Sequence, residues 1–213
     1  MKSKEKIFFL LDTSNLWIKK FLKKSLKTFP KKYNYIITEN YKIIKDSIVF
    51  VLSYTKILEK DFIKKNKKVL IIHPSNLPKD KGFAPVQNQI LRNKKLIYIC
   101  LLEAAEKVDS GPIIYRDTFL ILGHELSDQI RSKQALASFK LIGKFLKYFP
   151  KIRAYKQKGT SSFNKRRDPE DSELNINKTI KSQFNLLRIC DNDNYPAFFR
   201  HKKNTYFIKI FKK

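Results

Sequence analysis

The chain has 213 residues, of which 42% are hydrophobic, and its formal net charge is +27 at pH 7. This length is enough for one α/β domain with a full core and a short appendage but not for two large domains, so we expect a single active-site cleft. The sequence has no apolar run near the roughly 18 residues that would span a bilayer, and residues 1–6 lead into a strand-like segment without a small-residue cleavage site, which predicts a soluble, cytoplasmic protein.

The positive charge comes from 46 Lys and Arg against 19 Asp and Glu. Such an excess attracts polyanions, including nucleic acids, phosphates and anionic membrane faces. Most of the charge is lysine, scattered among Ile and Asn in nearly every segment, whereas a dedicated nucleic-acid binder more often clusters arginine with exposed aromatic residues. We therefore favour a compositional bias, typical of an AT-rich genome, and leave open that the charge helps to recruit a phosphorylated substrate.

Apolar runs of strand length recur through the first half of the chain. They occupy residues 7–11, 35–38, 47–52 and 69–72. These runs are continuous rather than alternating, which is typical of strands covered on both faces, so they predict a mainly parallel sheet. After the first run, a capping turn and an amphipathic helix up to residue 26 complete a βα unit, and residues 61–68 form a short charged connection at the end of a helix begun near Glu59.

The second half continues the α/β pattern and then changes character. We expect a helix at 85–91, strands at 96–102 and 113–115, a long amphipathic helix at 124–148 closed by Pro150, a surface loop at 156–173, a helix at 177–190, and a hairpin at 198–211 turned near 202–204. The predicted fold is therefore an open, mainly parallel Rossmann-like sheet flanked by helices, with a catalytic domain at 1–155 and an extension of loop, helix and β-hairpin at 156–213.

The two cysteines, Cys100 and Cys190, lie inside apolar stretches and show no metal-ligand spacing. A disulfide framework or a zinc site is therefore not expected. We predict two buried thiols and no metal.

The segment that follows the run at 69–72 carries the strongest sign of chemistry. His73 ends this run and is followed by a proline-containing loop and Gly82. Open α/β sheets bind their ligands at the carboxyl ends of the strands, which is where this ionisable side chain is expected. On its own, the position suits a catalytic histidine and a histidine that only satisfies its hydrogen bonds about equally.

A second polar segment follows the next predicted strand. Residues 103–114 contain Asp109 in an Asp-Ser-Gly-Pro turn, which taken alone is a common structural turn. We expect Asp109 to lie at the same carboxyl edge of the sheet as His73. An imidazole beside a carboxylate can shuttle protons, so the pair favours a catalytic centre over either residue alone.

These two segments resemble the folate-dependent formyltransferase family, which includes glycinamide ribonucleotide formyltransferase, methionyl-tRNA formyltransferase and the sugar N-formyltransferases. The resembling motifs are His-Pro-Ser with Leu-Pro and Gly at 73–82, Pro-Val-Gln at 85–87, and Val-Asp-Ser-Gly-Pro-Ile-Ile at 108–114. The similarity extends over about 47–199. It includes residues 52–58, which look like the segment lining the pterin pocket, and residues 186–199, which look like the linker after the catalytic domain.

The resemblance implies direct transfer of a formyl group from 10-formyltetrahydrofolate to an amine through a tetrahedral oxyanion. It implies that His73 donates to the oxyanion and that Asp109 holds the imidazole and helps to move protons through water. Oxyanion stabilisation of this type contributes several kcal/mol per donor. The residues implied to contact the folate are Lys56, Ile57, Leu58, Glu106, Val108 and Asp109.

One position departs from the family pattern. The family normally has an Asn two residues before the motif His, where it donates to the formyl oxygen, and here that position is Ile71. Losing one such donor costs about a hundred- to a thousand-fold in rate. Either Asn76, Ser75 or a backbone amide supplies the donor, or the protein is a slow or inactive relative; we favour a working enzyme because both His73 and Asp109 are present.

Comparison with the members of this family narrows the choice of acceptor. The chain ends at residue 213 after a hairpin, without the C-terminal β-barrel domain of the tRNA enzymes, and residues 12–16 keep only the Ser-Asn-Leu part of a phosphate loop, without its glycines. We therefore expect a nucleotide-linked amino sugar of surface-glycan synthesis, contacted by Ser14 and Asn15.

The diphosphate of such a substrate needs cations. The candidates are Lys165, Arg166, Arg167 and Arg188, because guanidinium groups suit phosphate oxygens. A self-neutralising charged turn explains residues 165–173 equally well.

Two further alternatives remain at this stage. One is a methionyl-tRNA formyltransferase-like enzyme, and the other is an inactive protein of the same fold whose basic surface binds nucleic acid. The apolar segment 206–208 with Phe211 is a candidate homodimer interface.

Overall fold

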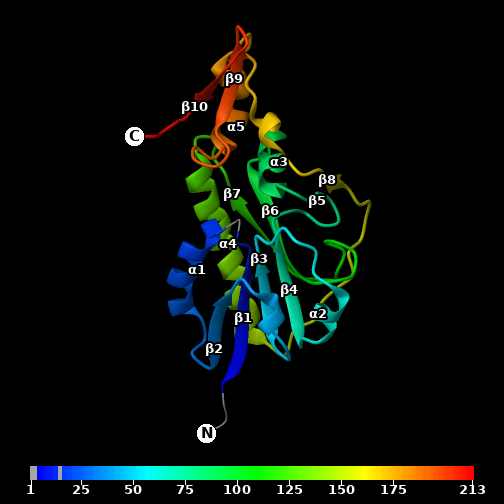
Figure 1. Cartoon of the computed structure of the whole chain (residues 1–213). Coiled ribbons are helices and arrows are strands. Elements are labelled where there is room, and N and C mark those ends of the chain that lie inside the picture. Colours follow the sequence, from blue (N-terminus) through cyan, green and yellow to red (C-terminus); the bar gives the residue numbers. More distant parts are fainter. Residues whose placement is uncertain (1–3, 14–15) are drawn as a thin grey trace.

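The structure, a computed structural model, describes residues 4–13 and 16–213. Its centre is a six-stranded sheet with the strand order β2-β1-β3-β4-β6-β7 (Figure 1). The strands are β1 (Glu5–Leu11), β2 (Tyr33–Thr38), β3 (Ile48–Leu52), β4 (Lys68–His73), β6 (Leu96–Glu103) and β7 (Ile113–Leu120). The predicted open α/β sheet is confirmed.

The sheet is parallel from β2 to β4 and antiparallel at its other side. Strands β2, β1, β3 and β4 pair in parallel, whereas β6 runs antiparallel to β4 and β7 antiparallel to β6. All five residues of β3 are buried, as a continuous apolar run predicts for a strand covered on both faces. The direction of β6 is important for the site described below.

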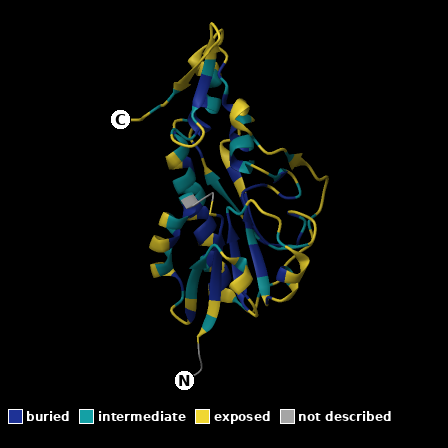
Figure 2. Ribbon diagram, in the orientation of Figure 1, coloured by how far each residue is buried: buried dark blue, intermediate teal, exposed yellow. Residues whose placement is uncertain are grey.

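Helices cover both faces of the sheet. The α-helices are α1 (Lys19–Ser25), α2 (Lys60–Lys64), α3 (Pro85–Leu91), α4 (Ser127–Tyr148) and α5 (Ile180–Ile189), and the short 3-10 turns are η1 (Leu16–Ile18), η2 (Leu26–Thr28), η3 (Tyr41–Ile43) and η4 (Pro169–Ser172). Helices α1 and α4 share one hydrophobic core with one face of the sheet, and α2 packs on the opposite face (Figure 2). The second face also carries the loops that build the site.

The end of the chain packs against the sheet domain at several points. Strand β8 (Phe163–Asn164) pairs in parallel with the two-residue strand β5 (Lys81–Gly82), and β9 (Ala197–His201) forms a hairpin with β10 (Asn204–Ile208). Ile189 of α5 joins a cluster with α3 and α4. The hairpin lies at one end of the molecule, far from the start of β1 at the other (Figure 1).

Most predicted elements are present, with differences at their ends. Strand β7 continues to Leu120, five residues beyond the predicted end, because its alternating polar residues still pair with β6. The small strands β5 and β8 were not expected, since two-residue strands leave no periodic pattern. Cys100 and Cys190 are free and buried, as predicted, and burial raises the pKa of both thiols.

Candidate active site

His73 is the last residue of β4 and its side chain is 7% exposed. Its Nδ1 lies 3.4 Å from Oδ1 of Asp109, and its Nε2 lies 2.9 Å from the carbonyl oxygen of Asp80. Both ring nitrogens therefore face oxygen acceptors. A hydrogen on Nε2 can be donated to the Asp80 carbonyl, while the Asp109 carboxylate lies beside the other ring nitrogen.

Asp109 reaches His73 by a different route from the one predicted. We expected both residues at the carboxyl edge of the sheet, but β6 is antiparallel to β4, and Glu103 at its end pairs with Leu70 rather than with His73. The end of β6 therefore lies toward the beginning of β4. The loop after β6 folds back over the face of the sheet and brings Asp109 to the imidazole. The predicted pairing is present in the structure, and its predicted geometric reason is wrong.

Three contacts hold the turn that contains Asp109 in place. Its Oδ2 accepts a hydrogen bond from the backbone N–H of Gly82 at 2.8 Å, and Nε2 of Gln157 donates to the carbonyl oxygens of Asp109 and Gly111, both at 2.8 Å. The φ angle of Asp109 is +51°, in the left-handed region that costs a residue other than glycine about 1 kcal/mol. These contacts offset that strain and fix the carboxylate beside His73.

Gln157 is a site residue that the sequence did not reveal. It lies in the segment predicted as a surface loop, beyond the predicted boundary at residue 155, and no motif marks it. Its Oε1 is buried and has no hydrogen-bond partner in the described chain. A single glutamine in a polar loop carries no periodic or motif signal, so only the fold could identify it.

Of the two predicted replacement donors, Ser75 is engaged elsewhere and Asn76 is held through its acceptor oxygen. Ser75 is fully buried and its hydroxyl donates to the carbonyl of Lys79, while Oδ1 of the exposed Asn76 accepts from Arg116 at 2.6 Å. Ile71 lies two residues before His73 on the same strand face and packs against the core clusters of that face. The position that resembles a donor site in the family is therefore filled by an apolar side chain.

The two segments predicted to bind folate lie side by side. Lys60, two residues after the first segment, forms an ion pair of 2.6 Å with Glu106 of the second, and Leu58 packs against the same core cluster as Ala104. The side chain of Ile57 is 79% exposed and that of Val108 is 46% exposed. Exposed apolar side chains next to loop backbone suit a flat heteroaromatic ring, which needs apolar contact on its faces and polar groups at its edge.

The segment that contains Lys56 is anchored to the end of β1. Asp12 is 1% exposed and its Oδ2 accepts from the backbone N–H of Thr55 at 2.9 Å and from the Thr55 hydroxyl. This contact positions Lys56 next to the carboxyl end of the parallel strands. Ser14 and Asn15, predicted to contact the substrate, lie outside the described residues.

The four predicted phosphate-binding cations do not gather in one place. Lys165 is exposed, Arg166 lies over the ring of Phe83 at 5.8 Å, and Arg167 donates to the carbonyl of Asp171 within the η4 turn. Of these contacts, only that of Arg167 lies within the segment of the charged-turn alternative.

Arg188 needs a correction as a phosphate-binding candidate. It is 3% exposed, its Nε donates to Asn185, and its guanidinium lies 3.7 Å from the buried Glu125. This is the geometry of a structural ion pair between α5 and the start of α4, because solvent and ligands do not reach the guanidinium.

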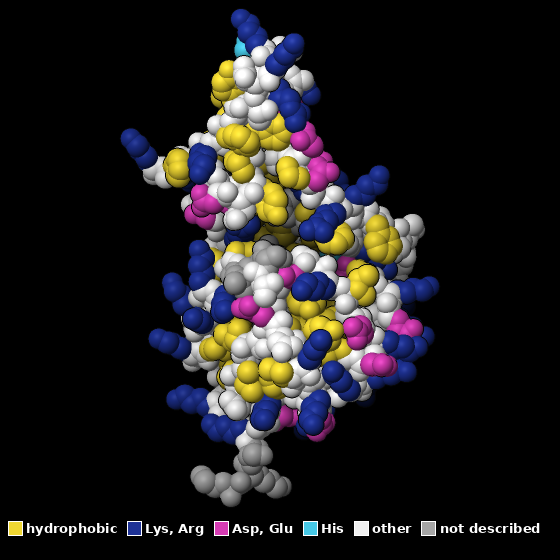
Figure 3. Space-filling view, viewed as in Figure 1, with side chains coloured by type: hydrophobic (Ala, Val, Ile, Leu, Met, Phe, Trp, Pro, Cys, Tyr) yellow, Lys and Arg dark blue, Asp and Glu magenta, His cyan; other side chains and the backbone are white. Residues whose placement is uncertain are grey.

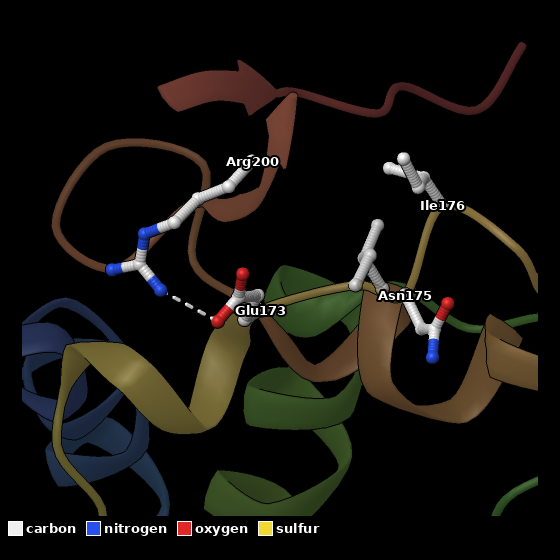
Figure 4. Close-up of a pocket in the computed structure, with 5 residues that line it drawn as sticks. Glu173, Asn175, Ile176 and Arg200 are labelled. Carbon is white, nitrogen blue, oxygen red and sulfur yellow. Dashed lines mark hydrogen bonds and ion pairs between the residues drawn. The ribbon is translucent and has the colours of Figure 1, made fainter. Parts of the chain in front are cut away.

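Two pockets of the described chain lie outside the His73–Asp109 contact. One, of about 380 Å³, is lined by residues of the extension, where Arg200 is paired with Glu173 at 2.7 Å (Figure 4). The other, of about 320 Å³, lies beside the loop after β4. Within the described residues, no helix is long and apolar enough to cross a membrane.

The mostly parallel sheet with helices on both faces defines an α/β protein. The buried His–Asp pair on one face of the sheet has the side chains that proton transfer needs. The chain belongs to the formyl transferase family, whose sequence model matches residues 15–143. Methionyl-tRNA formyltransferase from Pelagibacter ubique is 31% identical over 191 residues, covering 86% of this chain and 59% of that protein. The chain therefore spans about three-fifths of the length of this relative.

Two further solved structures share the fold of this chain. A sugar N-formyltransferase from Shewanella sp. matches with a TM-score of 0.73 and 15% identity, covering 99% of both chains. HypX from Aquifex aeolicus in complex with tetrahydrofolic acid matches with a TM-score of 0.74 and 16% identity, covering 95% of this chain and 37% of that one. At these identities the matches show the fold.

Proposed function

We propose that this protein is an N-formyltransferase that moves the formyl group of 10-formyltetrahydrofolate to the primary amine of a nucleotide-linked amino sugar. The observation that carries the proposal is the buried contact of 3.4 Å between His73 and Asp109, in a chain of the formyl transferase family. The sugar as acceptor is the finer part of the proposal and has its own support below.

The His73–Asp109 pair fits the chemistry of formyl transfer. The acceptor amine forms a bond to the formyl carbon, the bond from that carbon to the folate nitrogen breaks, and one proton passes from the amine to the departing nitrogen. Negative charge develops on the formyl oxygen, and a protonated His73 can donate to it. For this to happen, the oxygen must replace the Asp80 carbonyl at Nε2, while Asp109 keeps Nδ1 and the ring orientation.

The folate is proposed to bind between the segments joined by the Lys60–Glu106 ion pair. Ile57, Leu58 and Val108 offer apolar contact, and the loop that carries Asp109 offers backbone groups next to the imidazole. A solved structure with this fold in complex with tetrahydrofolic acid supports a folate as the cosubstrate. The formyl donor supplies the activated one-carbon group, and the protein supplies position and proton transfer.

The sugar acceptor is supported by the extent of one structural match. The Shewanella sugar N-formyltransferase covers 99% of both chains, so the match includes α5 and the C-terminal hairpin as well as the sheet domain. A structural neighbour from Francisella tularensis, described as a 4-N formyltransferase, covers 97% of both chains. These two matches extend over nearly all residues of this chain, which supports a sugar as the acceptor.

A second acceptor, an aminoacyl-tRNA, is favoured by a different observation. Relatives named methionyl-tRNA formyltransferase match at 26% to 31% identity, and a net charge of +27 would attract RNA. Figure 3 shows the Lys and Arg side chains spread over this face of the molecule rather than gathered in one patch. A dispersed charge gives weak, salt-sensitive binding more readily than a defined RNA site.

The experiment that tests the proposal measures formyl transfer by the full chain to two acceptors at equal concentration. One arm uses nucleotide-linked 4-amino sugars and the other uses methionyl-tRNA, both with 10-formyltetrahydrofolate and at two salt concentrations. Turnover with a sugar that exceeds turnover with the tRNA supports the proposal. Turnover with the tRNA alone moves the assignment to the second candidate, and folate binding without transfer to either acceptor contradicts both.

A further inference from the structure

We propose that the pocket of about 320 Å³ beside the loop after β4 binds a phosphate group of the acceptor, an inference that rests on the proposed formyl transfer. Its lining includes Asn76 and Lys79 from this loop, Arg116 from β7, and Lys158 and Thr160 from the loop after α4. Three cationic side chains thus converge on one hollow from three different parts of the chain, and its lining has no carboxylate.

The pocket is held in shape by Arg116. Its two terminal nitrogens donate to Oδ1 of Asn76 and to the carbonyl oxygen of Leu77, both at 2.6 Å. A guanidinium has five N–H donors, so three remain for a ligand after these two bonds. The contacts also fix the loop that follows His73 against β7, which makes the pocket a continuation of the active-site loop.

The cations of the pocket are not neutralised within the described chain. Lys79, Arg116 and Lys158 form no ion pair with any described Asp or Glu, whereas Arg200 in the other pocket is paired with both Glu170 and Glu173. An anion entering the pocket beside the loop after β4 meets positive charge that no described carboxylate already compensates. Lysine and arginine together suit phosphate oxygens, the arginine by directed hydrogen bonds and the lysines as point charges.

The pocket lies close to His73 because of the sheet register. His73 pairs with Cys100 on β6, and Cys100 pairs with Arg116 on β7, so the three residues form one row. Directly opposed residues of antiparallel strands share a face of the sheet and are about 5 Å apart, which places the Cα atoms of His73 and Arg116 about 10 Å apart. A sugar whose amine is at His73 can therefore extend its phosphate groups toward Arg116.

The inference is tested with a charge-matched pair of double variants. In K79Q/K158Q two exposed lysines of the pocket lose their charge, and neither ammonium has a hydrogen bond within the described chain, so folding should not change. In K23Q/K24Q two exposed lysines of α1, on the other face of the sheet, lose the same charge. Binding of inorganic pyrophosphate to the native chain and both variants is measured by titration calorimetry at low salt.

We expect K79Q/K158Q to weaken pyrophosphate binding at least tenfold and K23Q/K24Q to leave it within twofold of the native chain. Equal weakening in both variants would mean unspecific attraction and would overturn the site, as would failure of the native chain to bind pyrophosphate.

Steady-state kinetics then tests whether the pocket binds the phosphate groups of the acceptor or only free anions. In K79Q/K158Q the KM for a nucleotide-linked amino sugar should rise about tenfold, with kcat within twofold. An unchanged KM alongside weakened pyrophosphate binding overturns the assignment to the acceptor. If the native chain transfers no formyl group but binds pyrophosphate through this pocket, the proposed function fails and the anion site stands.

Discussion

Ile71 is the residue at which this site differs most from an oxyanion-binding arrangement. It lies on the same strand face as His73 but cannot donate a hydrogen bond, and the Ser75 hydroxyl donates to the carbonyl of Lys79. We predict that Ile71→Asn raises kcat at least tenfold, because one well-placed donor is worth about a hundred- to a thousand-fold when preorganised.

The measurement is the rate of tetrahydrofolate release at saturating substrates, with Ile71→Leu as an apolar control of similar volume. An increase in the Asn variant and none in the Leu variant supports a missing donor. Equal rates in both variants and the native chain would show that a backbone amide already fills this role.

Gln157 supports the catalytic turn from outside the predicted domain. In Gln157→Leu the carbonyls of Asp109 and Gly111 lose their donor, so we expect a stability loss of about 2 kcal/mol and a fall in kcat larger than the change in KM. Gln183→Leu is the matched control, because Gln183 also donates to backbone carbonyls but lies in α5. Denaturant unfolding and steady-state kinetics should show destabilisation in both variants and loss of kcat in the first alone.

At the scale of elements, the small β5–β8 pairing connects the extension to the site. Gly82 has a φ angle of +86°, and a Cβ atom added there would lie 2.7 Å from the carbonyl oxygen of Asn164. We predict that Gly82→Ala displaces β8, moves the N–H that binds Asp109, and lowers kcat at least tenfold.

Gly123→Ala is the control for backbone strain. Gly123 has a φ of +108° but an added Cβ would meet nothing within 4 Å, so this variant carries the conformational cost, of order 1–3 kcal/mol, without the close contact. Both variants should unfold at lower denaturant concentration. If Gly82→Ala keeps native kcat, the contact between β8 and Gly82 does not position Asp109.

The link between α4 and α5 depends on a buried carboxylate. Burial alone would raise the pKa of Glu125, but the N–H groups of Leu122 and Gly123 and the ammonium of Lys133 outweigh it and lower the pKa from the usual 4.5 to about 2. Because the folded pKa is depressed, this group stabilises the fold above pH 4.5 and the contribution is lost as the pH falls from about 4.5 to 2. The shift corresponds to about 3 kcal/mol.

We therefore predict that Glu125→Gln lowers the free energy of unfolding by about 3 kcal/mol at pH 7 and that the difference from the native chain shrinks toward pH 2. Glu39→Gln, which breaks a partly exposed pair with Lys19, should cost at most about 1 kcal/mol. Denaturant unfolding at pH 7 and pH 3 measures both. A constant difference between native and Glu125→Gln at the two pH values would contradict the depressed pKa.

The elements also show what the sequence could and could not predict. Continuous apolar runs predicted the strands, and helix α3 begins and ends where its pattern predicts. The antiparallel direction of β6 was missed, because a buried strand has the same composition whichever way it runs. His73 and Asp109 were still paired correctly from their motifs. Gln157 and the Gly82–Asn164 contact join segments that are far apart in the sequence, and such contacts leave no local sequence pattern.

At the scale of the whole molecule, the extension and the sheet domain share the site. Gln157, β8 and the buried Arg188–Glu125 pair all cross the predicted boundary between residues 155 and 156. The division into 1–155 and 156–213 remains a prediction about domains. The contacts indicate that a catalytic unit ending at residue 155 would lack part of the support for Asp109.

The most direct test of the central claim is the release of tetrahydrofolate by the full chain in the presence of a nucleotide-linked amino sugar, for the native protein, His73→Ala and Asp109→Asn. We predict that each substitution lowers kcat at least a hundredfold while 10-formyltetrahydrofolate still binds, because both residues act on the proton and on the formyl oxygen. If either variant kept the kcat of the native protein, the His73–Asp109 pair would not be catalytic.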